Sequence, residues 1–156
     1  MQASLPLAIA RIAVKAGTPI LLATLGEVYA ERSGILNLGI EGMMSAGAVF
    51  GFIAGLKTGD PWKGLIVAAA IGCLISMIHA FLCVSLHVNQ VVSGLALCMF
   101  GVGLSSIVGR DYVGIRGPAL QSLHIPVLSD IPILGPLLFE HDPMVYLTLA
   151  LDLVMW

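Results

Sequence analysis

Residues 27–42 place a dense group of polar side chains directly between two long apolar runs. The stretch reads EVYAERSGILNLGIEG and holds three carboxylates, one guanidinium and one amide, although only 10% of the chain is charged. On a helix, Asn37 and Glu41 share one face because they are four residues apart. An amide and a carboxylate on one face can bind the hydroxyls of a ribose or the edges of a base. A structural role for the pair is equally compatible with the sequence.

A second polar group opens a later apolar run, where Asn89, Gln90 and Ser93 stand at the start of an expected helix. Gln90 and Ser93 are three residues apart and share a helical face, which makes them candidates to line a polar pathway. Asn89 is a candidate for the same pathway, but asparagine is also a favoured N-cap residue. Both interpretations of Asn89 stay open.

The composition indicates that these polar groups belong to an integral membrane protein. Hydrophobic residues make up 58% of the chain and the mean hydropathy is +1.02, whereas about a quarter of the residues of a soluble domain are charged. The formal net charge is −2, without a Lys/Arg cluster. This argues against nucleic acid or an anionic lipid surface as a partner, and leaves the lipid bilayer itself as the surroundings.

Hydropathy and turn residues predict an all-α fold, a polytopic transmembrane helical bundle that forms a single domain over residues 1–156. The first helix contains Arg11 and Lys15, and only residues 16–25 of it are uninterrupted, so its depth in the membrane stays open. The last helix is too short to span, which predicts a chain truncated at its carboxyl end. The predicted helices cover residues 5–26, 35–56, 65–86, 89–108 and 144–156.

Residues 109–143 are expected to form a Pro-rich extramembrane loop. Each proline removes a backbone donor and opposes a continuous helix. Loops of this length without regular structure are usually functional. The prolines that set this expectation are Pro118, Pro126, Pro132, Pro136 and Pro143.

The glycines predict two further features. Gly47, Gly51 and Gly55 have the small-xxx-small spacing that lets one helix backbone approach another closely. A second set is expected to interrupt a helix near residues 33–42, where glycines allow the backbone to break. The glycines are Gly34, Gly39 and Gly42, and Arg32 just before them is expected to take part in the same structural break.

Glu41 is expected to have a partner, because an unpaired carboxylate at a membrane centre costs about 2.5 kcal/mol or more. Arg32 is the only base nearby in the sequence. An ion pair of Arg32 with Glu27, Glu31 or Glu41 would hold the break. His79, in the apolar run 65–86, has no acidic partner nearby and is interpreted as an interhelical hydrogen-bonding residue.

No motif predicts catalysis or metal binding. The three cysteines lie inside apolar runs without a CxxC or His/Cys spacing, so no metal site is expected. The chain has no P-loop sequence, and therefore no means to bind ATP in that manner. Ser76 and His79 are three residues apart, which is weak evidence for a nucleophile and its base. The chain is not expected to be an enzyme.

Two stretches resemble a known family. Residues 24–44 read TLGEVYAERSGILNLGIEGMM and residues 89–97 read NQVVSGLAL. They closely resemble the membrane-spanning permease subunits of bacterial ABC importers, in the superfamily of branched-chain amino acid and ribose permeases. The NQVVSG element is most similar to the nucleoside and simple-sugar branch. The resemblance covers essentially the whole chain.

The resemblance implies a multi-pass permease subunit of the bacterial plasma (inner) membrane, which forms part of the translocation pathway for a nucleoside or a simple sugar. It also implies three partners: an ABC ATPase subunit, a second permease subunit and an extracytoplasmic solute-binding protein. ATP would be used by the ATPase, and no cofactor is expected on this chain. Family members are longer and continue into a cytoplasmic coupling segment, so the resemblance implies an amino-terminal fragment.

Two other classes of function and one question of orientation stay open. A small oligomeric secondary transporter or channel would need a complete last helix and an internal repeat, and an intramembrane enzyme ranks below it. If the first helix crosses, six of the seven Lys and Arg side chains fall on one side, which favours a cytoplasmic amino terminus. The resemblance instead implies that the Pro-rich loop is external.

Overall fold

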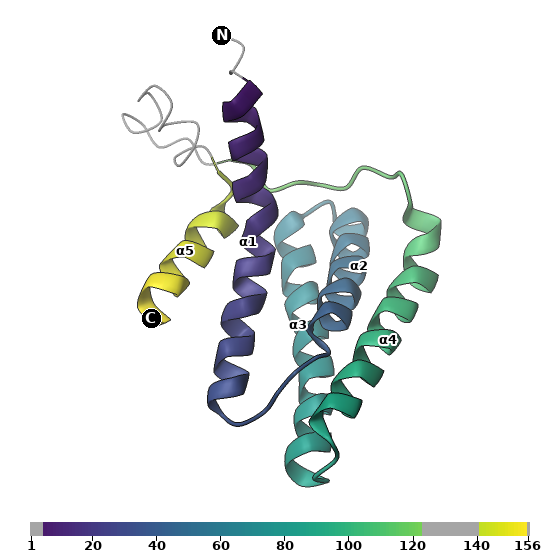
Figure 1. The fold of residues 1–156 in the computed structure, drawn as a ribbon. Helices are drawn as coiled ribbons and strands as arrows, with labels where there is room; N and C mark the ends of the chain where they lie inside the picture. Colours follow the sequence, from purple (N-terminus) through teal and green to yellow (C-terminus); the bar gives the residue numbers. More distant parts are fainter. Residues whose placement is uncertain (1–4, 123–140, 156) are drawn as a thin grey trace. The chain divides into compact units, whose positions relative to one another are not determined.

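Every regular element in the described part of the chain is helical. The computed structural model describes residues 5–122 and 141–155. The predicted all-α fold is therefore confirmed for these ranges. The elements, shown in Figure 1, are α1 (Leu5–Arg32), α2 (Ile40–Thr58), α3 (Pro61–Ala80), the π-helical turn η1 (Phe81–Ser85), α4 (Gln90–Gly109), the 3-10 turn η2 (Arg110–Tyr112) and α5 (Pro143–Met155).

Four helical stretches are long and apolar enough to cross a membrane. They are α1 with 28 residues, α2 with 19, α3 together with η1 with 25, and α4 together with η2 with 23. The first helix reaches this length because it continues to Arg32, beyond the predicted end at residue 26. The chain is thus a multi-pass membrane protein by the length and composition of its helices, whereas α5 has only 13 residues.

The chain forms two compact units, Gly26–Ala119 and Met1–Leu25 with Leu120–Trp156. In the first unit, α2 packs against both α3 and α4 (Figure 1). Its buried residues Met43 and Ala46 form a small core with Ile75 of α3 and Leu97 of α4. The helix α2 is therefore the central element of this unit.

Glycines bring the backbones of these helices close together. A Cβ atom added to Gly51 would lie 2.7 Å from Ala68 Cβ and 2.8 Å from Gly64 O, both on α3. One added to Gly47 would lie 3.0 Å from Ala68 O, whereas one at Gly55 would meet its neighbours at 3.6 Å or more. The small-xxx-small stripe thus faces α3, and contact is tightest at Gly51.

Two capping residues, Asp60 and Gly59, determine where α3 begins and where α2 ends. The predicted start at residue 65 is wrong, because Asp60 caps α3 by accepting a hydrogen bond from Trp62 N at 2.9 Å. Pro61 occupies the first turn, where its missing N–H costs nothing. Before it, Gly59 with φ of +70° closes α2.

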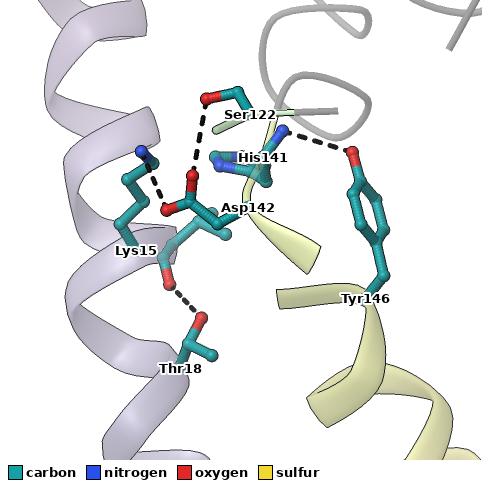
Figure 2. Close-up of polar contacts among 7 residues, drawn as sticks. Lys15, Thr18, Ser122, His141, Asp142 and Tyr146 are labelled. Atoms are coloured by element: carbon teal, nitrogen blue, oxygen red, sulfur yellow. Dashed lines mark hydrogen bonds and ion pairs between the residues drawn. The ribbon is translucent and has the colours of Figure 1, made fainter. Parts of the chain in front are cut away.

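In the second unit, the residue before α5 is fixed to α1. Lys15 Nζ lies 3.1 Å from Asp142 Oδ2, and the Ser122 hydroxyl donates to the other carboxylate oxygen at 3.5 Å (Figure 2). The Tyr146 hydroxyl accepts from His141 N at 3.2 Å. Val145 and Thr148 on α5 are buried.

Only part of the predicted loop 109–143 is described. Gly109 still belongs to α4, η2 adds a further helical turn, and a turn at residues 113–114 leads into the irregular stretch 115–122. Pro126, Pro132 and Pro136 lie outside the described residues.

Candidate functional site

Residues 33–39, here called the break segment, separate α1 from α2, and a glycine near their start ends the first of these helices. Gly34 has a φ of +86°, its N–H donates to Glu31 O at 2.9 Å, and Ile35 N donates to Ala30 O at 3.0 Å. These two bonds form the Schellman arrangement, in which a left-handed glycine ends a helix. The sequence SGI at residues 33–35 thus explains why α1 stops where it does.

At its other end the break segment turns into α2. Asn37 Oδ1 accepts from Gly39 N at 3.0 Å, the Asx turn that asparagine favours ahead of a helix. This turn lies against α4, since a Cβ atom added to Gly94 would be 2.8 Å from Leu38 N. The close approach leaves room only for glycine at that place on α4.

Gln90, the first residue of α4, forms two hydrogen bonds with the backbone of the break segment. Its Oε1 accepts from Leu36 N at 2.7 Å, and its Nε2 donates to Gly34 O at 3.1 Å. One amide side chain therefore satisfies a backbone donor and a backbone acceptor of the non-helical break segment.

His79 of α3 contacts the same segment from another helix. Its side chain is buried, with 3% exposed, and its Nε2 lies 3.2 Å from Leu36 O. Its Nδ1 lies 3.0 Å from the hydroxyl of Ser93 on α4. The interpretation of His79 as an interhelical hydrogen-bonding residue is thereby confirmed.

Glu27 supplies a contact from α1. Its Oε1 accepts from Asn37 N at 2.9 Å. Its Oε2 is enclosed and has no hydrogen-bond partner within the described ranges. The break segment is thus held by side chains from α1, α3 and α4, and these act on its backbone.

Asn37 and Glu41 do not share a helical face, and the expectation that they do is wrong. The helix α2 begins at Ile40 instead of residue 35, because the Asx turn at Asn37 precedes it. Asn37 lies in the break segment, whereas Glu41 is exposed in the first turn of α2. Met44 and Ala48 continue the exposed stripe that begins at Glu41.

The expected ion pair of Arg32 is also wrong. All four side chains are described, and none of Glu27, Glu31 and Glu41 lies within ion-pair distance of Arg32. Arg32 is the exposed last residue of α1, and the bonds that hold the break come from an amide, an imidazole and Glu27. All three side chains bind backbone N–H or C=O groups, so no cationic side chain is needed as their partner.

The three polar residues predicted at the start of α4 have different roles in the structure. Gln90 and Ser93 share a face directed at the break segment and at His79. Asn89 caps α4 by accepting from Val91 N at 3.0 Å and Val92 N at 3.2 Å.

The glycines expected at the break take different positions. Gly34 and Gly39 bound the non-helical residues, as the end of α1 and the N-cap of α2. Gly42 lies inside α2, so its expected place at the break is wrong. A Cβ atom there would lie 2.6 Å from the Cα of Cys98 on α4, which makes Gly42 a packing position.

The role of Glu27 was missed by sequence reasoning, which considered it only as a partner for Arg32. Its acceptor contact with Asn37 N spans ten residues across the end of a helix. No helical periodicity marks such a pair, because the path between the two residues includes a left-handed turn. A carboxylate near an apolar run was the only available signal.

Comparison with known proteins identifies a family. Residues 8–156 match the family model described as branched-chain amino acid transport system, permease component. The chain is 40% identical over 147 residues to a protein of Haloferax volcanii, provisionally named a glucose ABC transporter permease. It is 36% identical over 153 residues to the guanosine ABC transporter permease of Bacillus subtilis, and 29% identical over 150 residues to the nucleoside ABC transporter permease of Lactococcus lactis.

These matches use most of this chain but only part of each relative. They cover 92%, 88% and 89% of this chain, and 45%, 47% and 47% of the three relatives. The chain therefore spans about half the length of the curated relatives it matches. No solved structure matches it.

Proposed function

Since this chain belongs to the permease-component family of branched-chain amino acid transport systems, we propose that it forms part of the translocation pathway of an ABC importer for a nucleoside or a simple sugar. The family match over residues 8–156 carries this proposal. The names of the relatives support the substrate class, because they specify glucose, guanosine and nucleosides.

The proposed partners follow from the same class. An ABC ATPase subunit supplies the energy by hydrolysing ATP, while this chain binds no cofactor of its own. A second permease subunit completes the pathway, and an extracytoplasmic solute-binding protein delivers the substrate. The proposed location is the bacterial inner membrane. Four helical stretches of sufficient length and hydropathy support the membrane placement.

Within the site, we propose that the polar residues divide into two roles. Glu41 contacts the pathway, because it stands on the exposed stripe of α2 that contains Met44. Asn37 and Gln90 position the break segment ahead of that stripe, since their side chains are bonded to its backbone, and Ser93 supports it through His79. Interrupted helices next to a polar pathway are the usual construction of a transporter site.

Uptake by cells tests the proposal. A strain that expresses the complete transporter, and the same strain with the gene for this chain disrupted, are given radiolabelled guanosine, ribose or glucose at low concentration. We expect disruption to abolish uptake of one of these solutes and an intact copy of the gene to restore it. Unchanged uptake of all three, with the ATPase and binding protein present, would refute the proposed substrate class.

A further inference from the structure

We propose that His79 is a positioning residue of the pathway, which acts together with Gln90 to hold the break segment and thereby the first turn of α2. This inference rests on the proposed transport function. It assigns a role in the pathway to a residue of α3, although that residue is not on the exposed stripe of α2. Its basis is the geometry around a single residue, Leu36.

The two backbone polar groups of Leu36 are bound by two different helices. Leu36 N donates to Gln90 Oε1 at 2.7 Å, from the start of α4. Leu36 O lies 3.2 Å from His79 Nε2, near the end of α3. Since both groups belong to a non-helical residue between two apolar helices, losing either bond leaves a polar group with no partner inside its own element.

The hydrogen-bond pattern defines the form of the imidazole. A carbonyl oxygen only accepts, so His79 Nε2 carries the hydrogen in its contact with Leu36 O. In the neutral ring Nδ1 then accepts from the Ser93 hydroxyl, at 3.0 Å. A glutamine side chain has the same pair of functions, one donor and one acceptor, whereas a leucine has neither.

The end of α3 beyond His79 departs from regular helix, which agrees with a positioning role. The π-helical turn η1 follows directly after Ala80, and π-helical turns are frequent at functional sites. Cys83 in this turn lies 3.7 Å from His79 Nε2. The connection to α4 then contains His87 at a φ of +54°, which is uncommon for a residue other than glycine.

The test compares His79→Leu with His79→Gln in the complete transporter, with Ser76→Ala on the exposed side of α3 as control. Uptake per folded transporter gives Vmax and KM. We expect His79→Leu to lower Vmax about tenfold with little change in KM, because it removes both hydrogen bonds of the imidazole, to Leu36 O and to the Ser93 hydroxyl. His79→Gln is expected to stay within about threefold of the wild type, because it can make both bonds.

A second readout follows the break segment without transport. In a Leu36→Cys background, the rate of maleimide modification at residue 36 is measured by peptide mass spectrometry. This method reads residue 36 separately from the native cysteines, which therefore do not need to be replaced. We expect His79→Leu to raise this rate about tenfold and His79→Gln to leave it close to the background value. Equal rates in all three proteins, or equal damage by glutamine and leucine, would overturn the inference.

Gln90→Glu covers the case in which His79→Leu does not reach the membrane. A glutamate still accepts from Leu36 N but cannot donate to Gly34 O, so the modification rate at residue 36 should rise. An unchanged rate contradicts the inference. A wild-type transporter that moves neither nucleosides nor sugars would refute the proposed function, while the modification rates would still decide the role of His79.

Discussion

At the scale of single residues, the polar side chains of the bundle act on backbone groups. Gln90, His79 and Glu27 each bond to an N–H or C=O of the break segment. A backbone N–H or C=O that is shielded from water without a partner costs free energy, so a chain leaves the helical conformation where such partners exist. The break between α1 and α2 is therefore encoded on three helices, and most of that information lies far from the break in sequence.

Glu41 offers the most direct residue-scale prediction. Glu41→Gln removes a charge from the exposed stripe of α2. If the carboxylate contacts the pathway, uptake by the complete transporter should fall several-fold at a normal protein level. Glu31→Gln, at an exposed carboxylate near the end of α1, is the matched control and should transport normally. Normal uptake by Glu41→Gln would remove Glu41 from the pathway.

Glu27 yields a prediction about stability. Glu27→Leu leaves the partly buried Asn37 N without its acceptor, and the loss of such a hydrogen bond costs on the order of 1 kcal/mol. The thermal midpoint of the purified transporter in detergent should therefore drop. Glu27→Gln keeps an acceptor oxygen for the same N–H and should melt near the wild type. Equal midpoints for the leucine and glutamine variants would show that this bond contributes nothing.

At the scale of elements, α2 depends on small residues along two sides. Gly42 faces Cys98 of α4, and Gly51 faces Ala68 of α3, so one helix packs closely against two neighbours. Without a hydrophobic drive between helices in lipid, such close contact is a main source of helix association. The spacing of the glycines predicts that contact, but the sequence does not reveal which helix each glycine meets.

Two alanine variants on α2 test this packing. Gly42→Ala places a methyl group 2.6 Å from the backbone of Cys98, which has no flexible end that can move aside. We expect less folded protein and a lower thermal midpoint. Gly55→Ala, where the nearest atoms lie at 3.6 Å or more, should be tolerated. If both variants melt alike, the close contact of α2 with α4 is refuted.

The helix boundaries show what the sequence could and could not predict. Five helices were expected and five α-helices are present in the described residues, because long apolar runs are a strong signal. The starts of α2 and α3 differ from the predicted positions, because the Asx turn at Asn37 and the cap at Asp60 decide them. The contacts of Glu27, His79 and Gln90 depend on how separate helices pack, which local periodicity does not encode.

At the scale of the whole molecule, each helix that crosses the membrane moves the chain to the opposite side, and this predicts the topology of α2. The break segment precedes α2 and the turn at Gly59 follows it, so the two should lie on opposite sides of the membrane. Cysteines introduced as Ser33→Cys and Thr58→Cys, both at exposed positions, should react with an impermeant maleimide from opposite faces. Reaction of both from the same face would show that α2 does not cross.

The same experiment resolves the orientation that the cationic side chains and the family resemblance leave in conflict. Labelling of Thr58→Cys from outside would agree with an external Pro-rich loop. Labelling from inside would agree with the positive-inside rule. In either case the native cysteines must first be replaced, of which Cys83 is buried and Cys73 is exposed.

Transport into sealed vesicles tests the central claim most directly. The complete importer, with its ATPase and solute-binding protein, is reconstituted into liposomes, and uptake of labelled guanosine and glucose is followed with and without ATP. We predict ATP-dependent accumulation of a nucleoside or a simple sugar that is absent when this chain is omitted. Accumulation that proceeds without this chain, or that fails for every nucleoside and simple sugar despite ATP hydrolysis, would contradict the assignment.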